Sequence, residues 1–93
     1  MNMRFVYPAV IRRVSEEKYT GYFPDLEDCV FSGDSLDDAI EAAKEAEEAW
    51  IRVELEENGD LPAISDLDDI PRAEGEILRQ IAITVRLMDG WDE

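Results

Sequence analysis

Histidine is absent from this chain of 93 residues. The side chain that most often moves protons near neutral pH is therefore missing, and so are the Ser-His and Cys-His arrangements of nucleophilic enzymes. The single cysteine, Cys29, cannot form an intramolecular disulfide, and it follows an acidic stretch that disfavours a reactive thiolate. We expect Cys29 to be a small buried residue at the start of a strand, in a protein of a reducing, cytoplasmic compartment.

Long apolar runs are also missing. No segment approaches the roughly 20 apolar residues that a membrane-spanning helix requires, so no membrane partner is expected. The N-terminal "MNMRFVYPAVIRR" has a short apolar run closed by arginines, which does not fit a signal peptide. The length and the absence of an internal repeat predict a single domain over residues 1–93.

Positive charge is scarce. Nine basic residues stand against 24 acidic ones, which gives a formal net charge of -15. Such a surface repels phosphate backbones, and the arginines are dispersed along predicted strands, so we expect no direct contact with nucleic acid. A basic protein is the natural partner. The alternative is that the acidity only keeps the protein soluble.

Carboxylates are abundant, but their pattern does not predict a metal site. None of the acidic stretches matches the twelve-residue calcium loop. Two-metal nucleases place carboxylates at neighbouring strand ends, whereas the predicted strands "FVYPAVIRRV" and "YTGYF" contain none. "SGDS" lacks the lysine of a phosphate-binding loop. We therefore expect no catalytic residue, metal or cofactor, and assign the carboxylates to turns and to a helix cap.

Three short strands are predicted before any helix. Residues 5–14 are rich in β-branched and aromatic side chains. Pro8 has no donor for a ladder, so this strand starts near Ala9, lies at an edge or is bulged there. Residues 19–23 form the return strand of a hairpin that ends at Pro24-Asp25, and residues 29–31 form a short third strand.

A long amphipathic helix follows. Ser35 is a good N-cap, and Asp38 three residues later makes a pattern like a capping box. Glu48 and Arg52 form a favourable i,i+4 pair on the exposed face, and Asn58-Gly59 ends the helix. The predicted apolar stripe consists of Leu36, Ala39, Ile40, Ala43, Ala46, Trp50 and Val53.

Residues 76–87 alternate as a half-buried final strand. Ile77, Ile81, Ile83, Val85 and Leu87 face one way, and a wetter face points the other way. The element order is therefore β-β-β-α-β. This order predicts an α+β fold with an antiparallel sheet that one helix covers on one face.

The chain resembles the HicB-like antitoxins of bacterial and archaeal toxin–antitoxin systems. The resemblance runs from Tyr7 to about Gly59 and depends on the order of its landmarks. These are "YPAVI", "GYFPDLEDC", the corner "SGDS" and the helix opening "LDDAIEAAKEA". Family members commonly have Pro-Asp-Leu-Pro-Gly-Cys where this chain has Pro-Asp-Leu-Glu-Asp-Cys.

The resemblance implies a truncated RNase H-like fold without the catalytic carboxylates of the parent nuclease. It also implies an antitoxin that binds and neutralises a small basic HicA-type toxin, an mRNA-cleaving protein. Many relatives carry a C-terminal DNA-binding domain. None follows "MDGWDE", so we expect a short form that does not bind its operator directly.

The acidic surface would imitate the charge of RNA and block the active site of the toxin. Aromatic and aliphatic anchors are expected to control residence time. The proposed partner-binding residues are the anchors Tyr22, Phe23 and Leu26 and the charges Asp25, Glu27, Asp28 and Asp34. Core packing is the equally supported alternative for Phe23 and Leu26.

Self-association is a further expectation. Open sheet edges favour a homodimer or tetramer, and Trp91 in the acidic tail could pack on a second copy. Two other functions stay open at this point. One is an oligomeric domain of the same family that binds an unrelated protein, and the other is a metal-dependent RNase H-like nuclease.

Overall fold

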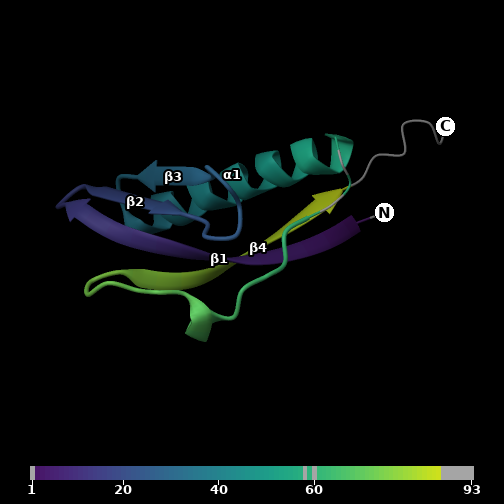
Figure 1. The fold of residues 1–93 in the computed structure, drawn as a ribbon. Helices are drawn as coiled ribbons and strands as arrows, with labels where there is room; N and C mark the ends of the chain where they lie inside the picture. The colour runs from purple at the N-terminus through teal and green to yellow at the C-terminus, as the bar shows by residue number, and fades with distance from the viewer. Residues whose placement is uncertain (1, 58, 60, 87–93) are drawn as a thin grey trace.

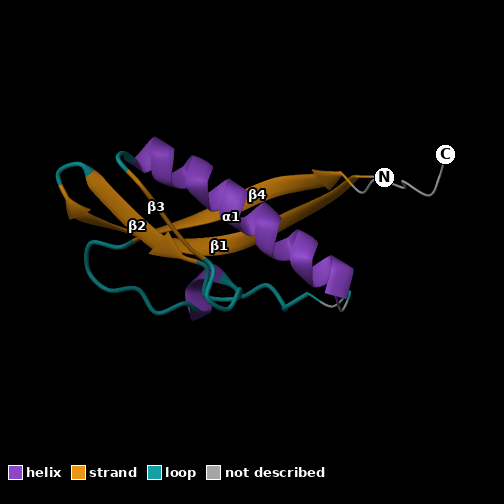
Figure 2. Ribbon diagram, turned by 90° about the horizontal axis from the view of Figure 1, so that it is seen from above, coloured by secondary structure: helices purple, strands orange, loops and turns teal. Residues whose placement is uncertain are grey.

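The computed structural model describes residues 2–57, 59 and 61–86 as one antiparallel sheet with a long helix on one face (Figure 1). The sheet has the strand order β3-β2-β1-β4, so the last strand joins it beside the first. The helix α1 crosses the sheet diagonally (Figure 2). The elements are β1 (Asn2–Ser15), β2 (Lys18–Tyr22), β3 (Val30–Gly33), α1 (Leu36–Glu57), the short 3-10 helix η1 (Leu67–Asp69) and β4 (Ile77–Arg86). This is the predicted α+β fold with β-β-β-α-β order.

Strand β1 starts at Asn2, three residues before the predicted strand of residues 5–14. It runs through Pro8, which lies opposite Gln80 of β4. On its other side β1 pairs with β2 only from Val10 onward, where Val10 lies opposite Tyr22. Of the three alternatives predicted for Pro8, the start near Ala9 is wrong and the edge position is confirmed, because the strand has a partner on one side only at Pro8. A proline is tolerated at such a locally exposed edge, where its missing donor interrupts no ladder.

Both faces of the sheet are partly covered. Phe5, Tyr7 and Ile11 of β1 pack in the main core under α1. Pro8 and Val10 point to the opposite face, and both are fully buried. The connection before β4 runs along that opposite side (Figure 1) and contributes a buried residue, Ile70. The helix covers one face as predicted, and this connection closes part of the other.

The corner between β3 and α1 depends on Gly33. A Cβ atom at this position would collide with the backbone of Asp38 and Ala39 in the first turn of the helix. Ser35 caps that turn as predicted, since its Oγ accepts a hydrogen bond from the N–H of Asp38 at 3.1 Å. The motif "SGDS" thus lets the end of the strand and the start of the helix approach closely.

The buried side of α1 differs from the predicted stripe. Its fully buried residues recur at every fourth position, namely Ala39, Ala43, Glu47 and Ile51. Val53 of the predicted stripe is 52% exposed, so its assignment to the core is wrong. The reason is the diagonal crossing, which centres the contact on the line through residue 47 and moves the end of the stripe away from the sheet.

The remaining details of α1 and β4 mostly follow the prediction. Glu48 and Arg52 form an ion pair at 3.0 Å. Gly59 has a left-handed φ of 77° and donates its N–H to the carbonyl of Glu54 at 2.9 Å, which closes the helix. In β4, Ile81, Ile83 and Val85 are buried, whereas Gln80 and Thr84 are exposed. Asn58, Leu87 and Trp91 lie outside the described residues. No helix in the described part of the chain is long and apolar enough to cross a membrane.

Glu47 is a carboxylic acid inside the core. Its side chain is fully buried, and neither carboxylate oxygen has a hydrogen-bond partner in the structure. Burial raises its pKa to about 8. Burial, together with the negative charge of Glu47, raises the pKa of Cys29 to about 11. The protonated, neutral form of Glu47 is therefore the one that the fold favours at neutral pH.

This burial predicts a specific pH dependence of stability. The folded chain holds the Glu47 proton up to about pH 8, whereas the ordinary pKa is 4.5, so the free energy of unfolding falls as pH rises through this window. Glu47→Gln removes the titration. We expect urea denaturation to show little change at about pH 5 and a stabilisation of ~1–3 kcal/mol at about pH 9. Glu45→Gln, an exposed change on the same helix, is the control. Parallel pH profiles for Glu47→Gln and the unchanged chain would contradict this account.

Candidate functional site

The predicted partner-binding residues lie in and around the connection between β2 and β3. Three backbone hydrogen bonds of 3.1 Å fold this connection into a closed loop. The N–H of Phe23 donates to the carbonyl of Cys29, that of Leu26 to Phe23, and that of Cys29 to Leu26. The loop is therefore held by its own backbone, and the direction of each side chain is fixed.

Phe23 and Leu26 point inward. They are 2% and 1% exposed, and the rings of Phe23 and Phe31 meet edge to face with centroids 5.4 Å apart. Such an aromatic pair stabilises a core beyond its buried area. Both side chains belong to the core, as the alternative interpretation holds, and the structure does not present them as exposed anchors.

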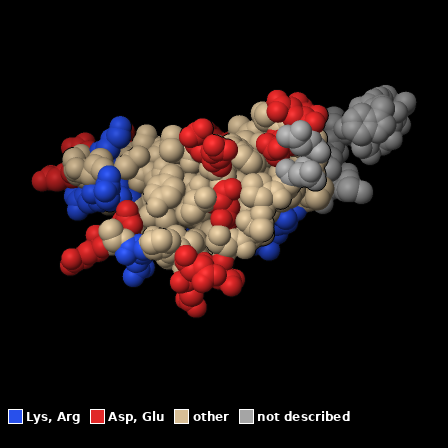
Figure 3. All heavy atoms as spheres, viewed as in Figure 1, with Lys and Arg blue, Asp and Glu red and all other residues tan. Residues whose placement is uncertain are grey.

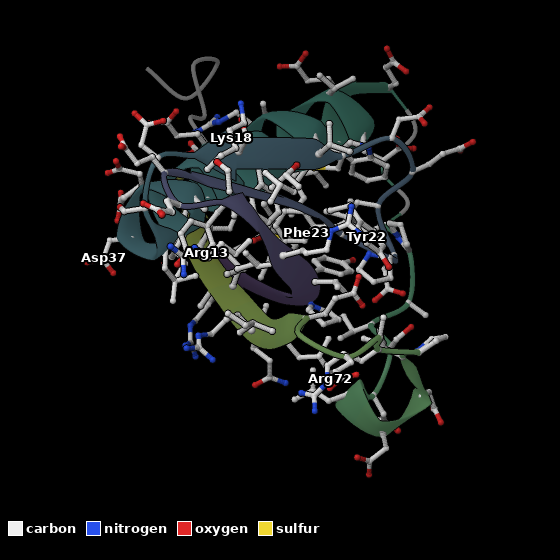
Figure 4. All side chains as sticks on the ribbon, turned by 90° about the vertical axis from the view of Figure 1, so that its left-hand side faces the viewer. Arg13, Lys18, Tyr22, Phe23, Asp37 and Arg72 are labelled. Atoms are coloured by element: carbon white, nitrogen blue, oxygen red, sulfur yellow. The ribbon has the colours of Figure 1, made fainter. Side chains whose placement is uncertain are left out.

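Tyr22 has a different environment from its neighbour Phe23, and both side chains are labelled in Figure 4. Tyr22 is 43% exposed. It lies opposite Val10 of β1 and Val30 of β3, and Val30 is 66% exposed. Because alternate strand residues share a face, Tyr22 and Val30 form an exposed apolar pair on the side of the sheet away from α1.

Asp25 makes a structural contact. Its Oδ2 accepts the N–H of Ser65 at 2.8 Å, and its Oδ1 accepts the Ser65 hydroxyl at 2.5 Å. The hydroxyl of Tyr7 donates to the carbonyl of Pro62 in the same connection at 2.5 Å. The carboxylate of Asp25 thus holds the segment after α1 against the β2–β3 loop, and this use competes with a role as a charge for a partner.

Asp28 occupies a position that favours glycine. Its φ is 62°, and it is the third residue of a turn that the Cys29 N–H closes on the Leu26 carbonyl. Glu27 has no positive φ, so the turn is of type II, which prefers proline second and glycine third. Those are the two residues that HicB-like proteins commonly have here. The turn is kept in this chain, and Asp28 bears its strain because aspartate tolerates the left-handed region better than most residues.

The exposed side of this loop borders a groove. The groove has a volume of about 450 Å³ and lies between the start of β3 and the C-terminal half of α1. Glu27 and Asp28 are exposed at its rim, and Glu54 lines it from the helix. The apolar part of its lining consists of Cys29, Val30, Ala46, Ala49, Trp50 and Val53.

Trp50 connects the two walls of the groove. Its indole N–H donates to the carbonyl of Glu27 at 2.9 Å, so the helix and the loop are joined by a direct hydrogen bond. Asp34 lies at the other end of β3, in the corner before α1, and does not line the groove. Of the predicted residues, the structure brings Glu27 and Asp28 together at this groove and leaves Tyr22 and Asp34 on other parts of the surface.

Charge is unevenly distributed over the surface. Figure 3 shows acidic groups along the length of the molecule, while several lysine and arginine groups gather at the end that carries the β1–β2 turn. Arg13 and Lys18 belong to that end (Figure 4). No group of three or more His, Cys, Asp and Glu residues suitable for a metal ion occurs among the residues that the structure describes.

Comparison with known proteins places the chain in a family. The model of the HicB-like antitoxin of bacterial toxin–antitoxin systems matches residues 7–89. The chain belongs to the HicB-like antitoxin family. This HicB-like chain is 34% identical to a chain of the solved HicA3 and HicB3 toxin–antitoxin complex. The match covers 82% of this chain and 94% of that one, with a TM-score of 0.64.

A second solved structure agrees in fold. The N-terminal domain of the Burkholderia pseudomallei antitoxin HicB is 21% identical, with a TM-score of 0.71 over 89% of this chain and all of that one. This likeness supports the four-stranded antiparallel sheet with one helix. A search of curated proteins gives no match to the sequence.

The groove is the part of the site that the sequence did not predict. Its components were visible as separate signals, since Val53 lies near the end of the apolar stripe and Glu27-Asp28 replaces the family's Pro-Gly. Their proximity depends on where α1 crosses the sheet, and no local pattern contains that angle.

The strain at Asp28 gives a test of the turn. We expect Asp28→Gly to raise the free energy of unfolding by ~0.5–1 kcal/mol, because glycine adopts a positive φ without a Cβ clash. Chemical denaturation measures the change. Glu27→Gly in the same turn is the control, and it should be neutral or destabilising since its φ is not positive. Equal effects at the two positions would show that Asp28 is unstrained.

Proposed function

We propose that this chain is an antitoxin that binds a small basic HicA-type toxin and blocks its activity. The observation that carries the proposal is membership of the HicB-like antitoxin family over residues 7–89. The 34% identity to a chain of a toxin–antitoxin complex supports it. The toxin is the partner that this complex and the charge of the chain both favour.

The proposed mechanism is electrostatic attraction followed by occlusion. A net charge of -15 attracts a cationic protein and raises its association rate, and an acidic surface imitates the phosphates of an RNA substrate. The antitoxin then acts by covering a surface and carries out no reaction of its own. The absence of histidine agrees with this role, because common proton-transfer arrangements depend on that side chain.

The proposed contact surface includes four of the seven partner-binding residues predicted from the sequence. Tyr22, Glu27, Asp28 and Asp34 are exposed and free to meet a partner, whereas Phe23 and Leu26 support the loop from the core. Asp25 acts indirectly by holding the connection after α1 in place. The loop is rigid before binding, which lowers the entropy lost on association.

Self-association is a second part of the proposal. Strands β3 and β4 end the sheet on either side, and a homodimer or tetramer would cover one of these edges. Sedimentation at micromolar concentration tests this part. A monomer under these conditions would remove it without affecting toxin binding.

Co-expression with the basic protein encoded by the neighbouring reading frame tests the main proposal. We expect the two proteins to co-purify and the antitoxin to restore growth of cells that produce the toxin. Association should slow by about tenfold or more between low and high salt, because screening weakens attraction between opposite charges. The control is the neighbouring protein expressed alone.

Two results would contradict the proposal. One is a failure of the pair either to bind or to interact genetically. The other is cleavage of RNA by the purified chain itself in the presence of Mg²⁺, which would favour the nuclease interpretation.

A further inference from the structure

We propose that the groove between β3 and the C-terminal half of α1 receives a segment of the toxin that combines an aliphatic side chain with a lysine or arginine. The aliphatic part would contact Ala49 and Val53, and the cation would lie at the C-terminal end of α1. This inference rests on the proposed function, since it locates the toxin on one surface of the antitoxin.

The apolar lining of the groove is exposed to an unusual degree. Val53 is 52% exposed, and Ala49, one turn earlier on the same helix, is exposed as well. Val30, which is 66% exposed, borders the groove from the edge strand, with its side chain on the other face of the sheet. All three line the same groove. Contiguous exposed apolar residues with a polar rim are typical of interaction sites, whereas scattered ones are ordinary. The groove therefore offers apolar area that a partner can bury.

Negative charge is concentrated at the C-terminal end of α1. The helix macrodipole places partial negative charge at this end, where lysine or arginine is favourable. The last turn of α1 contains no basic residue and carries Glu54, Glu56 and Glu57. The first turn, by contrast, has the favourable acids Asp37 and Asp38. Acid is thus present at both ends of the helix, and a cation from outside would complement the end next to the groove.

Backbone groups at the groove are also available. β3 is the last strand of the sheet, so no strand pairs with its outer side within residues 2–57, 59 and 61–86. An extended segment can add to such an edge through main-chain hydrogen bonds, while its side chains enter neighbouring pockets. The hydrogen bond from Trp50 to the Glu27 carbonyl keeps the walls of the groove in place before binding.

Charge favours the toxin over a second copy of this chain as the occupant. A second copy carries the same net charge of -15 and would bring acid toward Glu27, Asp28 and Glu54. Several lysine and arginine groups of a second copy gather at its β1–β2 turn (Figure 3). One of them, Arg13, already donates to the carbonyls of Ser15 at 3.0 Å and Glu16 at 3.3 Å within its own chain. A basic toxin meets neither obstacle.

Two substitutions test the groove while changing little else. Ala49→Trp places a bulky ring in the groove from an exposed helical position, and Ser15→Trp, at the end of β1 beside the distant β1–β2 turn, is its control. Glu27→Lys reverses a charge at the rim, and Glu16→Lys makes the same change of net charge, from -15 by two units to -13, at the distant turn. Circular dichroism and urea denaturation confirm that each variant is folded.

The readout is the dissociation constant for the HicA-type protein encoded beside this chain. We expect Ala49→Trp and Glu27→Lys each to weaken binding by about tenfold or more, whereas the two controls change it by less than about threefold. Glu27→Lys should also reduce the salt dependence of the association rate more than Glu16→Lys does.

Each other outcome has a defined meaning. If the unchanged chain binds the toxin and both groove variants bind like their controls, the groove is not the contact and the antitoxin function stands. If Ala49→Trp alters self-association and leaves toxin binding unchanged, a second copy occupies the groove and the inference is wrong. If the unchanged chain does not bind the toxin, the proposed function and this inference fail together.

Discussion

The close contact between the end of β3 and the first turn of α1 fixes the rest of the molecule. It exists because Gly33 has no Cβ atom where the backbone of Asp38 and Ala39 passes. From this point α1 runs diagonally over the sheet, held by small residues such as Ala39 and Ala43 that allow the helix to lie close. The crossing leads the C-terminal half of the helix to the β2–β3 loop, and the groove is the space that remains between them.

The acidic residues of the loop serve different physical purposes although they resemble one another in sequence. Asp25 is a hydrogen-bond acceptor for Ser65, and Asp28 supplies the left-handed residue of a type II turn. Glu27 is exposed at the rim, with its backbone carbonyl used by Trp50. Counting the acidic residues of the loop therefore overestimates the charge available for a partner. Some of these carboxylates, such as that of Asp25, make hydrogen bonds that stabilise the loop itself.

Local signals predicted the elements, and tertiary geometry decided the exceptions. Ser35 as a cap, the Glu48–Arg52 pair and the alternation of β4 were recognisable because each depends on neighbours within a few positions. The sequence left open which of the three alternatives at Pro8 applies, since the effect of Pro8 depends on whether a strand lies on its β2 side. Val53 was misplaced, and the burial of Glu47 was not predicted, for a related reason. A helical stripe can be drawn through either line of residues, and only the crossing angle selects the buried one.

A chain with so many acids can remain folded and still favour a cationic partner. Like charges repel within the compact state, and this repulsion lowers stability below what the core alone would give. Binding of a basic protein to the folded state removes part of the repulsion and stabilises the fold by mass action. Glu56 and Glu57 at the end of α1 illustrate the point, because negative charge is unfavourable next to the C-terminal end of a helix dipole, and a cation beside it would offset that cost. In the proposed complex, stability that the isolated chain forgoes at this helix end would return as affinity for the toxin.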